Sequence, residues 1–383
     1  MSEEDSLPFH HWLLSDAART GTYRRAISQV VRKNDVVLDI GAGSGILSFF
    51  ACLAGARKVY AIEMSEALAL ARELCASNGF NGIVEFRQGR SQDIQLPEPV
   101  DVVVSDTGCS FGLQGGLLGI LLDAKKRFLK PGGRIIPRSL QLLVAPVEIT
   151  DSRNLDIWEK DRYGLDLSSI RRFAANTDYH MKLTAEDMLA PPASLATIEF
   201  EEVDSPYVAG EIISVAARDG VLHGLGAWLQ LELAPGVSFT NSPLESAVEW
   251  TQSFFPIEKP VALRAGDRVR AKIQTNNGEV WRWQVEVTDG SAAAAVSPAV
   301  KARFDQSTLW NFPVAPQNLK KQLSNYQPKL SRKGEAEMYL LRAFDGKRSA
   351  GELADDLLER FADLFPSRAS AAKFISSVVW RCT

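Results

Sequence analysis

Apolar and polar positions follow two different periods along the chain. From Val36 to about Val147, short apolar runs such as VVLDI, KVYAIE and VDVVVSD alternate with stretches of helical periodicity such as GILSFFACLAG. Strands that alternate with helices of this length predict a mostly parallel, doubly wound α/β sheet. Beyond Pro146, the segments ATIEFEEV, EIISVAAR and VWRWQVEV alternate with a period of two. That period predicts an antiparallel sandwich or barrel.

The two periods divide the chain into four parts. We expect a Rossmann-like domain over residues 1–147 and an antiparallel β-barrel domain over residues 148–305, with a helical arm at about 151–180. The segment WNFPVAPQNLKKQLSNYQPK contains Pro and Asn, which predicts a linker over residues 306–329. Amphipathic helices then predict a small helical, winged-helix-like module over residues 330–383.

Composition excludes several function classes. The net charge of −4 gives no basic surface for nucleic acid or for an anionic membrane, so neither is expected as a partner. The four cysteines lack C-x-x-C spacing, and no His is spaced with a Cys or an acid pair, so no metal is expected. The chain also lacks an apolar run of about 18 residues, and its first residues are acidic where a signal peptide would be basic. We expect a soluble, cytoplasmic protein.

A glycine loop follows the first predicted strand. Gly41, Gly43 and Gly45 open the helical stretch GILSFFACLAG, and Glu63 ends the next strand, about 20 residues further on. An acid at that place is suited to hydrogen-bond a ribose diol. Dinucleotide enzymes usually have G-x-G-x-x-G, whereas this loop has G-x-G-x-G with Asp39 just ahead of it.

The carboxylate of Asp39 indicates which ligand the loop binds. It would repel a pyrophosphate but would suit a cationic amino group, as in S-adenosylmethionine. From these residues alone, a flavin- or nicotinamide-binding loop and an unliganded turn remain alternatives.

Several segments, in the same order, resemble the protein arginine methyltransferases from about residue 10 to about residue 290. These are SDAARTGTYRRAI, VVLDIGAGSGILSFFACLAGARKVYAIE, GRSQDIQLP, WEKDRYGLDLSSIRR, GLGAWLQLEL and SPLESAVEWTQSFFPIEKPVALRAGDRV. The resemblance implies a methyltransferase that uses S-adenosylmethionine, with a protein or peptide substrate and a homodimer formed through the arm. It places Arg19 on the cofactor's carboxylate, and Ser91 and Gln92 at its adenine. Asp39, the three loop glycines and Glu63 take the roles of the family's cofactor motif.

The acceptor loop departs from the family pattern. The family uses two glutamates on one loop to pair with the substrate guanidinium, which stays charged because its pKa lies above about 12. Counting back from LKPGG, the first position falls on Asp106 and the second on Gly115. The first acid is therefore one methylene shorter and the second is absent.

A barrel segment also departs from the pattern, because the family's Thr-His-Trp triplet reads Val248-Glu249-Trp250 here. Two interpretations of Glu249 remain open: it replaces the missing glutamate from across the cleft, or it is a surface residue. On the first interpretation, Asp106 and Glu249 are the catalytic acids.

Three hypotheses for the function remain open. The first is N-methylation of a protein or peptide side chain, arginine by resemblance. The second is methylation of a histidine, amine or carboxylate in a small molecule or in a peptide, including a ribosomally made natural-product precursor. The third is a catalytically silent scaffold that binds the cofactor. In the last module, FDGKRSAGELADDL resembles peptide-recognition modules of ribosomal peptide biosynthesis, although a packing role for the module is the preferred interpretation.

Overall fold

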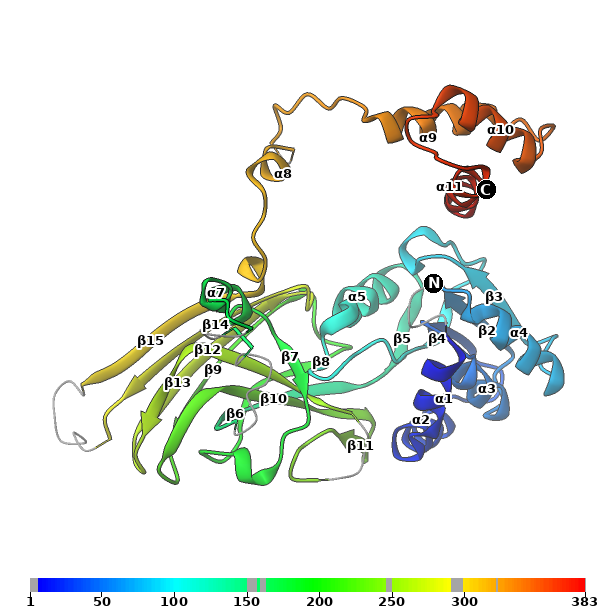
Figure 1. Ribbon diagram of the computed structural model, residues 1–383. Coiled ribbons are helices and arrows are strands. Elements are labelled where there is room, and N and C mark those ends of the chain that lie inside the picture. The colour runs from blue at the N-terminus through cyan, green and yellow to red at the C-terminus, as the bar shows by residue number, and fades with distance from the viewer. Residues whose placement is uncertain are drawn as a thin grey trace. The chain divides into compact units, whose positions relative to one another are not determined.

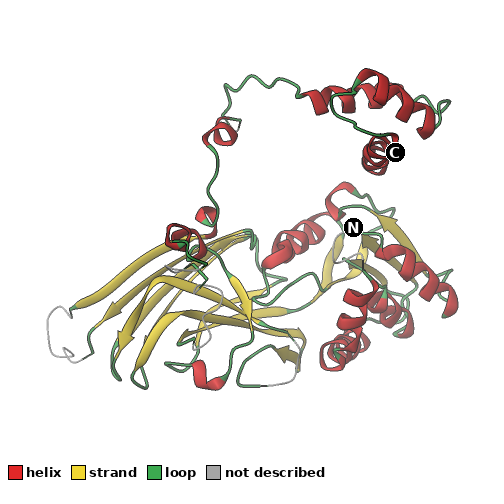
Figure 2. Ribbon diagram, in the orientation of Figure 1, coloured by secondary structure: helices red, strands yellow, loops and turns green. Residues whose placement is uncertain are grey.

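The computed structural model describes residues 6–149, 157–158, 163–245, 250–290, 299–321 and 323–382. Contacts divide the chain into two compact units, Met1–Pro313 and Val314–Thr383. The division falls inside the linker that we expected at 306–329. Figures 1 and 2 show helices packed around a parallel sheet, followed by an antiparallel β region.

The first part of unit 1 is a five-stranded parallel sheet with the order β3-β2-β1-β4-β5. Its strands are β1 (Val36–Ile40), β2 (Lys58–Glu63), β3 (Val84–Gln88), β4 (Val100–Ser105) and β5 (Leu129–Ile136). All five residues of β1 are buried, as expected for a central strand covered on both faces. The strand order reverses between β1 and β4, which is where open α/β sheets bind ligands.

Five helices accompany this sheet. They are α1 (Leu7–Ser15), α2 (Ala17–Val30), α3 (Ile46–Leu53), α4 (Ala67–Ser77) and α5 (Leu117–Arg127). Asp16 caps α2 by accepting a hydrogen bond from the Arg19 backbone N–H at 2.9 Å. This cap fixes the start of the helix that carries the Arg19 side chain.

Two antiparallel sheets form the β domain, residues 139–307. The first has the order β7-β12-β10-β6-β8, and β11 pairs with β10; the second has the order β15-β14-β13-β9. The strands are β6 (Ser139–Val147), β7 (Tyr179–Met181), β8 (Ala193–Glu199), β9 (Tyr207–Val215), β10 (Gly220–Ala234), β11 (Val237–Thr240), β12 (Gln252–Leu263), β13 (Arg268–Asn276), β14 (Val280–Thr288) and β15 (Val300–Ser307). Trp283 of β14 is fully buried, and its indole N–H donates to the Pro256 carbonyl of β12 at 2.7 Å. The two sheets thus share one core.

The structure moves the expected boundary at residue 147. The expected first domain, residues 1–147, includes β5 and also β6, but β6 pairs with β8 and β10 in the antiparallel sheet. Pro137 lies between the two strands and has no N–H with which to continue a ladder. The β domain therefore begins at Ser139, nine residues before the expected start at 148.

The expected helical arm, at about 151–180, falls partly outside the described residues. Its described residues contain a 3-10 turn at Ser168–Ile170, one short helix, α7 (Arg171–Ala174), and the first residues of β7. Two of its apolar side chains, Tyr163 and Leu165, are exposed. These two side chains are therefore available for a contact, whereas Trp158 of the arm packs against a buried cluster that includes Phe254.

Unit 2 has a core of its own. It contains α8 (Pro316–Lys320), α9 (Arg332–Ala343), α10 (Ala350–Arg360) and α11 (Arg368–Cys382). Leu340, Leu357 and Ile375 lie in one buried cluster contributed by the last three helices. Over 314–321 and 323–382 the unit has helices and no strand, so the predicted wing is not confirmed.

Candidate active site

One cavity of about 840 Å³ lies at the carboxyl edge of the parallel sheet. Its walls include Gly41 after β1, Glu63 at the end of β2, Ser91 beyond β3 and Asp106 directly after β4. Residues of α1 and of the β domain also line the cavity. Binding at this edge was expected from the doubly wound sheet, because the β1–β4 reversal separates the loops that follow the strands.

The glycine loop approaches the cavity with its main chain. Gly41, Gly43 and Gly45 have φ values of 75°, 52° and 81°, a region that favours glycine. A Cβ on Gly43 would lie 3.2 Å from Cε1 of His10, and one on Gly41 would lie 2.4 Å from Cγ2 of Thr107. The loop therefore has a glycine-specific conformation in which Gly41 and Gly43 line the cavity, with Thr107 and His10 packed close to them.

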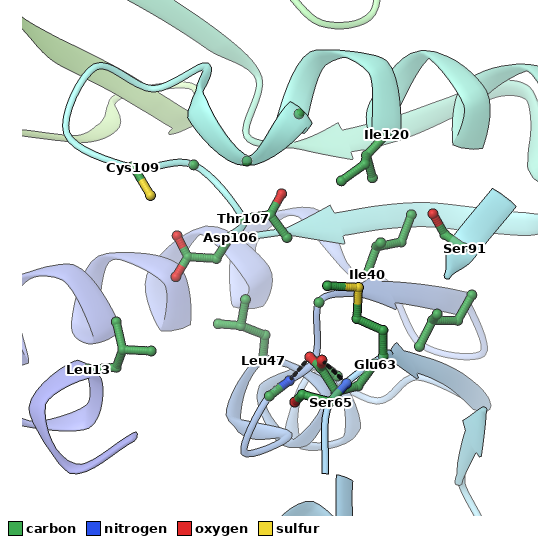
Figure 3. Close-up of a pocket in the computed structure, with 18 of the residues that line it drawn as sticks. Leu13, Ile40, Leu47, Glu63, Ser65, Ser91, Asp106, Thr107, Cys109 and Ile120 are labelled. Carbon is green, nitrogen blue, oxygen red and sulfur yellow. Dashed lines mark hydrogen bonds between the residues drawn. The ribbon is translucent and has the colours of Figure 1, made fainter. Parts of the chain in front are cut away.

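Glu63 holds this loop from the neighbouring strand. Its carboxylate accepts hydrogen bonds from the backbone N–H groups of Gly43, at 2.9 Å, and Ser65, at 2.8 Å. Figure 3 shows both bonds, with Asp106 located beyond the end of β4. An oxygen bonded in this way keeps lone-pair capacity for a second donor, such as a ribose hydroxyl.

Asp39 differs from the expectation. It is 1% exposed and does not line the cavity, because it lies beneath the loop and accepts a hydrogen bond from the Ser48 hydroxyl at 2.6 Å. Burial raises the pKa of Asp39 to about 7. Gly45 does not line the cavity either, since it caps α3 in the left-handed conformation.

Arg19 and Asp106 form an ion pair inside the cavity wall. The Arg19 guanidinium also donates to the Leu13 carbonyl at 3.0 Å and lies over the Trp250 ring, 5.8 Å from its centroid. Burial raises the pKa of the Asp106 carboxyl, while the Arg19 charge opposes that rise. Residues assigned to the cofactor and to the acceptor are therefore in direct contact.

The remaining expected residues divide into three groups. Ser91 and Gln92, the residues expected near an adenine, both line the cavity. Gly115 lines it too, and confirms that the loop carries no acid at this position. Glu249 lies outside the described residues, although Trp250 and Thr251 beside it are part of the wall.

Most wall residues were not among the expected site residues, and three polar ones bear on the chemistry of the site. His10 is buried against Gly43 and its Nε2 has no hydrogen-bond partner in the described chain. Asn277 and Glu279 come from the β13–β14 hairpin. An Asn-Gly pair is typical of a hairpin turn, but nothing in the sequence indicates what this turn contacts.

The residues present fit S-adenosylmethionine. Gly41 and Gly43 line the cavity with their main chain, and Glu63 lines it at the end of the neighbouring strand. The buried atoms His10 Nε2 and Arg19 Nε both lack a partner in the described chain. Unpartnered buried donors are costly, so a polar ligand beside them is favoured.

Family models match two segments of the chain. Residues 31–174 match a methyltransferase domain, and residues 139–288 match the arginine methyltransferase oligomerization subdomain. Protein arginine N-methyltransferase 1 of Schizosaccharomyces pombe is 31% identical over 291 residues, which cover 71% of this chain and 84% of that protein. The chain belongs to the protein arginine N-methyltransferase family. It is an S-adenosylmethionine-dependent methyltransferase.

Other family members show how far the likeness extends. Probable protein arginine N-methyltransferase 6 of Arabidopsis thaliana is 32% identical over 253 residues, which cover 62% of this chain and 58% of that protein. A solved structure titled as the Trypanosoma brucei PRMT1 enzyme-prozyme heterotetrameric complex with AdoHcy matches with a TM-score of 0.68 and 25% identity. It covers 80% of this chain and 100% of that chain. Protein arginine methyltransferase 10 of Arabidopsis thaliana, with a TM-score of 0.68 and 23% identity, supports the fold.

Proposed function

We propose that this protein transfers the methyl group of S-adenosylmethionine to a guanidinium nitrogen of arginine in a protein or peptide. The observation that carries the proposal is that Asp106, at the end of β4, lines the same cavity as the glycine loop and Glu63. The cavity thus has a cofactor side and an acidic acceptor side. The relatives are named for arginine methylation, which favours arginine over histidine, an amine or a carboxylate.

The cofactor side follows from the contacts of three residues. Glu63 would hold the ribose, the N–H edge of the loop around Gly43 would follow the amino-acid portion, and Arg19 would hold the carboxylate. Ser91 and Gln92 would flank the adenine. S-adenosylmethionine, when bound there, supplies an electrophilic methyl group on its sulfonium.

The acceptor side has to hold a second cation close to the first. A carboxylate at Asp106 offsets the charge of an incoming guanidinium and orients one nitrogen toward the methyl group. In the transfer, the sulfur–carbon bond breaks as the nitrogen–carbon bond forms, and the attacked nitrogen loses one proton to a wall carboxylate or to water. Glu249, which lies outside the described residues, is one proposed source of a second acid for this pocket.

Assembly and location complete the proposal. We propose a homodimer formed through the arm, supported by its exposed Tyr163 and Leu165 and by the match to the oligomerization subdomain. A cytoplasmic location is proposed because the cysteine spacing suggests no disulfide framework, which fits a reducing compartment. In the part of the chain that the structure describes, no helix is long and apolar enough to cross a membrane.

A protein extract supplies the test of the acceptor class. The extract is incubated with the protein and methyl-labelled S-adenosylmethionine, and hydrolysed proteins are analysed for labelled amino acids. Label in methylarginine is the expected result, and Asp106→Asn should reduce it. Label confined to methylhistidine, or released as methanol from hydrolysed methyl esters, with none in methylarginine, would contradict the arginine assignment.

A further inference from the structure

The β13–β14 hairpin is docked on the loop that carries the acceptor-side acid. Three residues, Asn277, Gly278 and Glu279, connect the paired residues Asn276 and Val280. The Asn277 side-chain oxygen accepts a hydrogen bond from the Gly119 backbone N–H at 2.7 Å. A Cβ on Gly278 would lie 2.0 Å from the Leu113 carbonyl oxygen. Only glycine fits this contact, so the hairpin tip has a fixed position against residues 113–119.

The loop beneath the hairpin has no room for its own second acid. Gly115 has a φ of 81°, and a Cβ there would lie 2.6 Å from the Thr107 carbonyl oxygen. A glutamate at this position would therefore need a different loop conformation. The loop supplies one carboxylate, Asp106, and that carboxylate is already paired with Arg19.

Glu279 follows the docked glycine directly and lines the same cavity as Asp106 and Gly115. Its side chain is exposed, and no hydrogen bond or ion pair engages its carboxylate within the described chain. A carboxylate held at a cavity wall without a cationic partner attracts a cationic ligand.

We propose that Glu279 is a specificity-determining residue that supplies the second carboxylate for a cationic acceptor side chain, from the β domain instead of the loop. This inference rests on the proposed function and deepens it. The guanidinium would enter between Asp106 on the sheet side and Glu279 on the hairpin side. Asn277 and Gly278 fix the hairpin on the loop. Asp106 and Glu279 therefore keep a constant position relative to each other, although they lie in different segments of the chain.

The test measures recognition of charge separately from catalysis. The full chain is saturated with S-adenosylhomocysteine and titrated with acetyl-Gly-Arg-Gly-amide and with the counterpart that contains citrulline, which is neutral but similar in shape. The wild type, Glu279→Gln and Glu249→Gln are compared with the control Glu202→Gln. Glu202 is an exposed glutamate outside the cavity wall.

We expect the wild type and Glu202→Gln to bind the arginine peptide more tightly than the citrulline peptide. Glu279→Gln should weaken arginine binding on the order of fivefold, as for a partly exposed ion pair, and leave citrulline binding unchanged. Affinity for S-adenosylhomocysteine should stay equal in Glu279→Gln, Glu202→Gln and the wild type, which confirms that the cofactor side is intact.

Two outcomes would overturn the inference in distinguishable ways. If Glu279→Gln binds arginine like a wild type that discriminates against citrulline, the second acid lies elsewhere and the proposed function stands. In that case, weaker arginine binding in Glu249→Gln alone would identify Glu249 as the second acid. If the wild type itself shows no preference for arginine, both the role of Glu279 and the arginine acceptor are contradicted.

Discussion

Arg19 of α2 and Asp106 after β4 form an ion pair within the wall of the cavity. One residue is assigned to the cofactor's carboxylate and the other to the acceptor. The Arg19 guanidinium therefore has two anionic partners to satisfy once a cofactor binds, and the two halves of the site are electrostatically coupled. Replacement of Asp106 should therefore change cofactor affinity, and replacement of Arg19 should change acceptor binding.

Asp106→Asn keeps the shape of the side chain and removes its charge. We expect turnover to fall by about a hundredfold, because the acceptor cation loses its fixed counter-charge. Affinity for S-adenosylhomocysteine should not fall and should rise a few-fold, since Arg19 no longer shares its charge with an anionic neighbour. Initial rates and calorimetry measure the two effects. Normal turnover in Asp106→Asn would contradict the assignment of Asp106 to the acceptor site.

Glu63→Gln tests the cofactor side. Glutamine replaces a carboxylate that accepts from two backbone N–H groups, so the loss of charge-assisted bonding should weaken S-adenosylhomocysteine binding by about 1.5–3 kcal/mol. Calorimetry gives the affinity, and thermal unfolding reports whether the fold is kept. Glu73→Gln, an exposed change on α4, serves as the control and should bind like the wild type. Unchanged affinity in folded Glu63→Gln would contradict the ribose assignment.

Asp39 makes stability depend on pH. Its pKa in the folded protein is about 7 against a usual value of 3.8, so between these values the folded state holds a proton that the unfolded state has lost. Stability therefore falls as pH rises through this window, by at most about 1.4 kcal/mol per pH unit from this group.

Asp39→Asn removes this contribution to the pH dependence. The free energy of unfolding of the wild type minus that of the variant should fall by roughly 2 kcal/mol between pH 5 and pH 7. Urea titrations of both proteins at several pH values measure the difference. A difference that does not change with pH would show that the buried carboxyl keeps its usual pKa.

The arm prediction concerns assembly. Tyr163 and Leu165 are 86% and 61% exposed, an arrangement that a dimer contact would explain. Light scattering at micromolar concentration should give twice the 42.1 kDa mass of one chain. Replacement of both residues by serine should shift the mass toward one chain, whereas Tyr207→Ser, at an exposed tyrosine of β9, should not. A monomeric wild type would contradict the arm contact.

The local pattern of the chain predicted the β1–loop–α3–β2 unit, because buried strands, alternate glycines and a terminal acid are all short-range signals. The start of the β domain was misplaced, because the apolar period runs on through β5 and β6 while the change of sheet occurs at Pro137. Asp39 was expected to meet the ligand, and it instead lies beneath the loop on Ser48. The sequence places Asp39 just ahead of the loop, but it does not show on which side of the loop the carboxylate lies.

The acceptor side contains one feature that the sequence predicted and one that it could not predict. The lack of an acid at Gly115 follows from the sequence, because the position lies at a fixed spacing before LKPGG. The approach of Glu279 does not, since more than 150 residues separate the hairpin from the loop and their contact depends on tertiary packing through Asn277 and Gly278.

The most direct test of the central claim is to locate the transferred methyl group. Gly-Arg-Gly repeat peptides, with a citrulline-substituted set as control, are incubated with the protein and S-adenosylmethionine, and tandem mass spectrometry assigns the mass increase to an atom group. The account predicts methylation on the arginine guanidinium, none on the citrulline set, and strong loss in Asp106→Asn. Methyl groups found on another side chain or on the peptide termini, with the guanidinium unmodified, would contradict it.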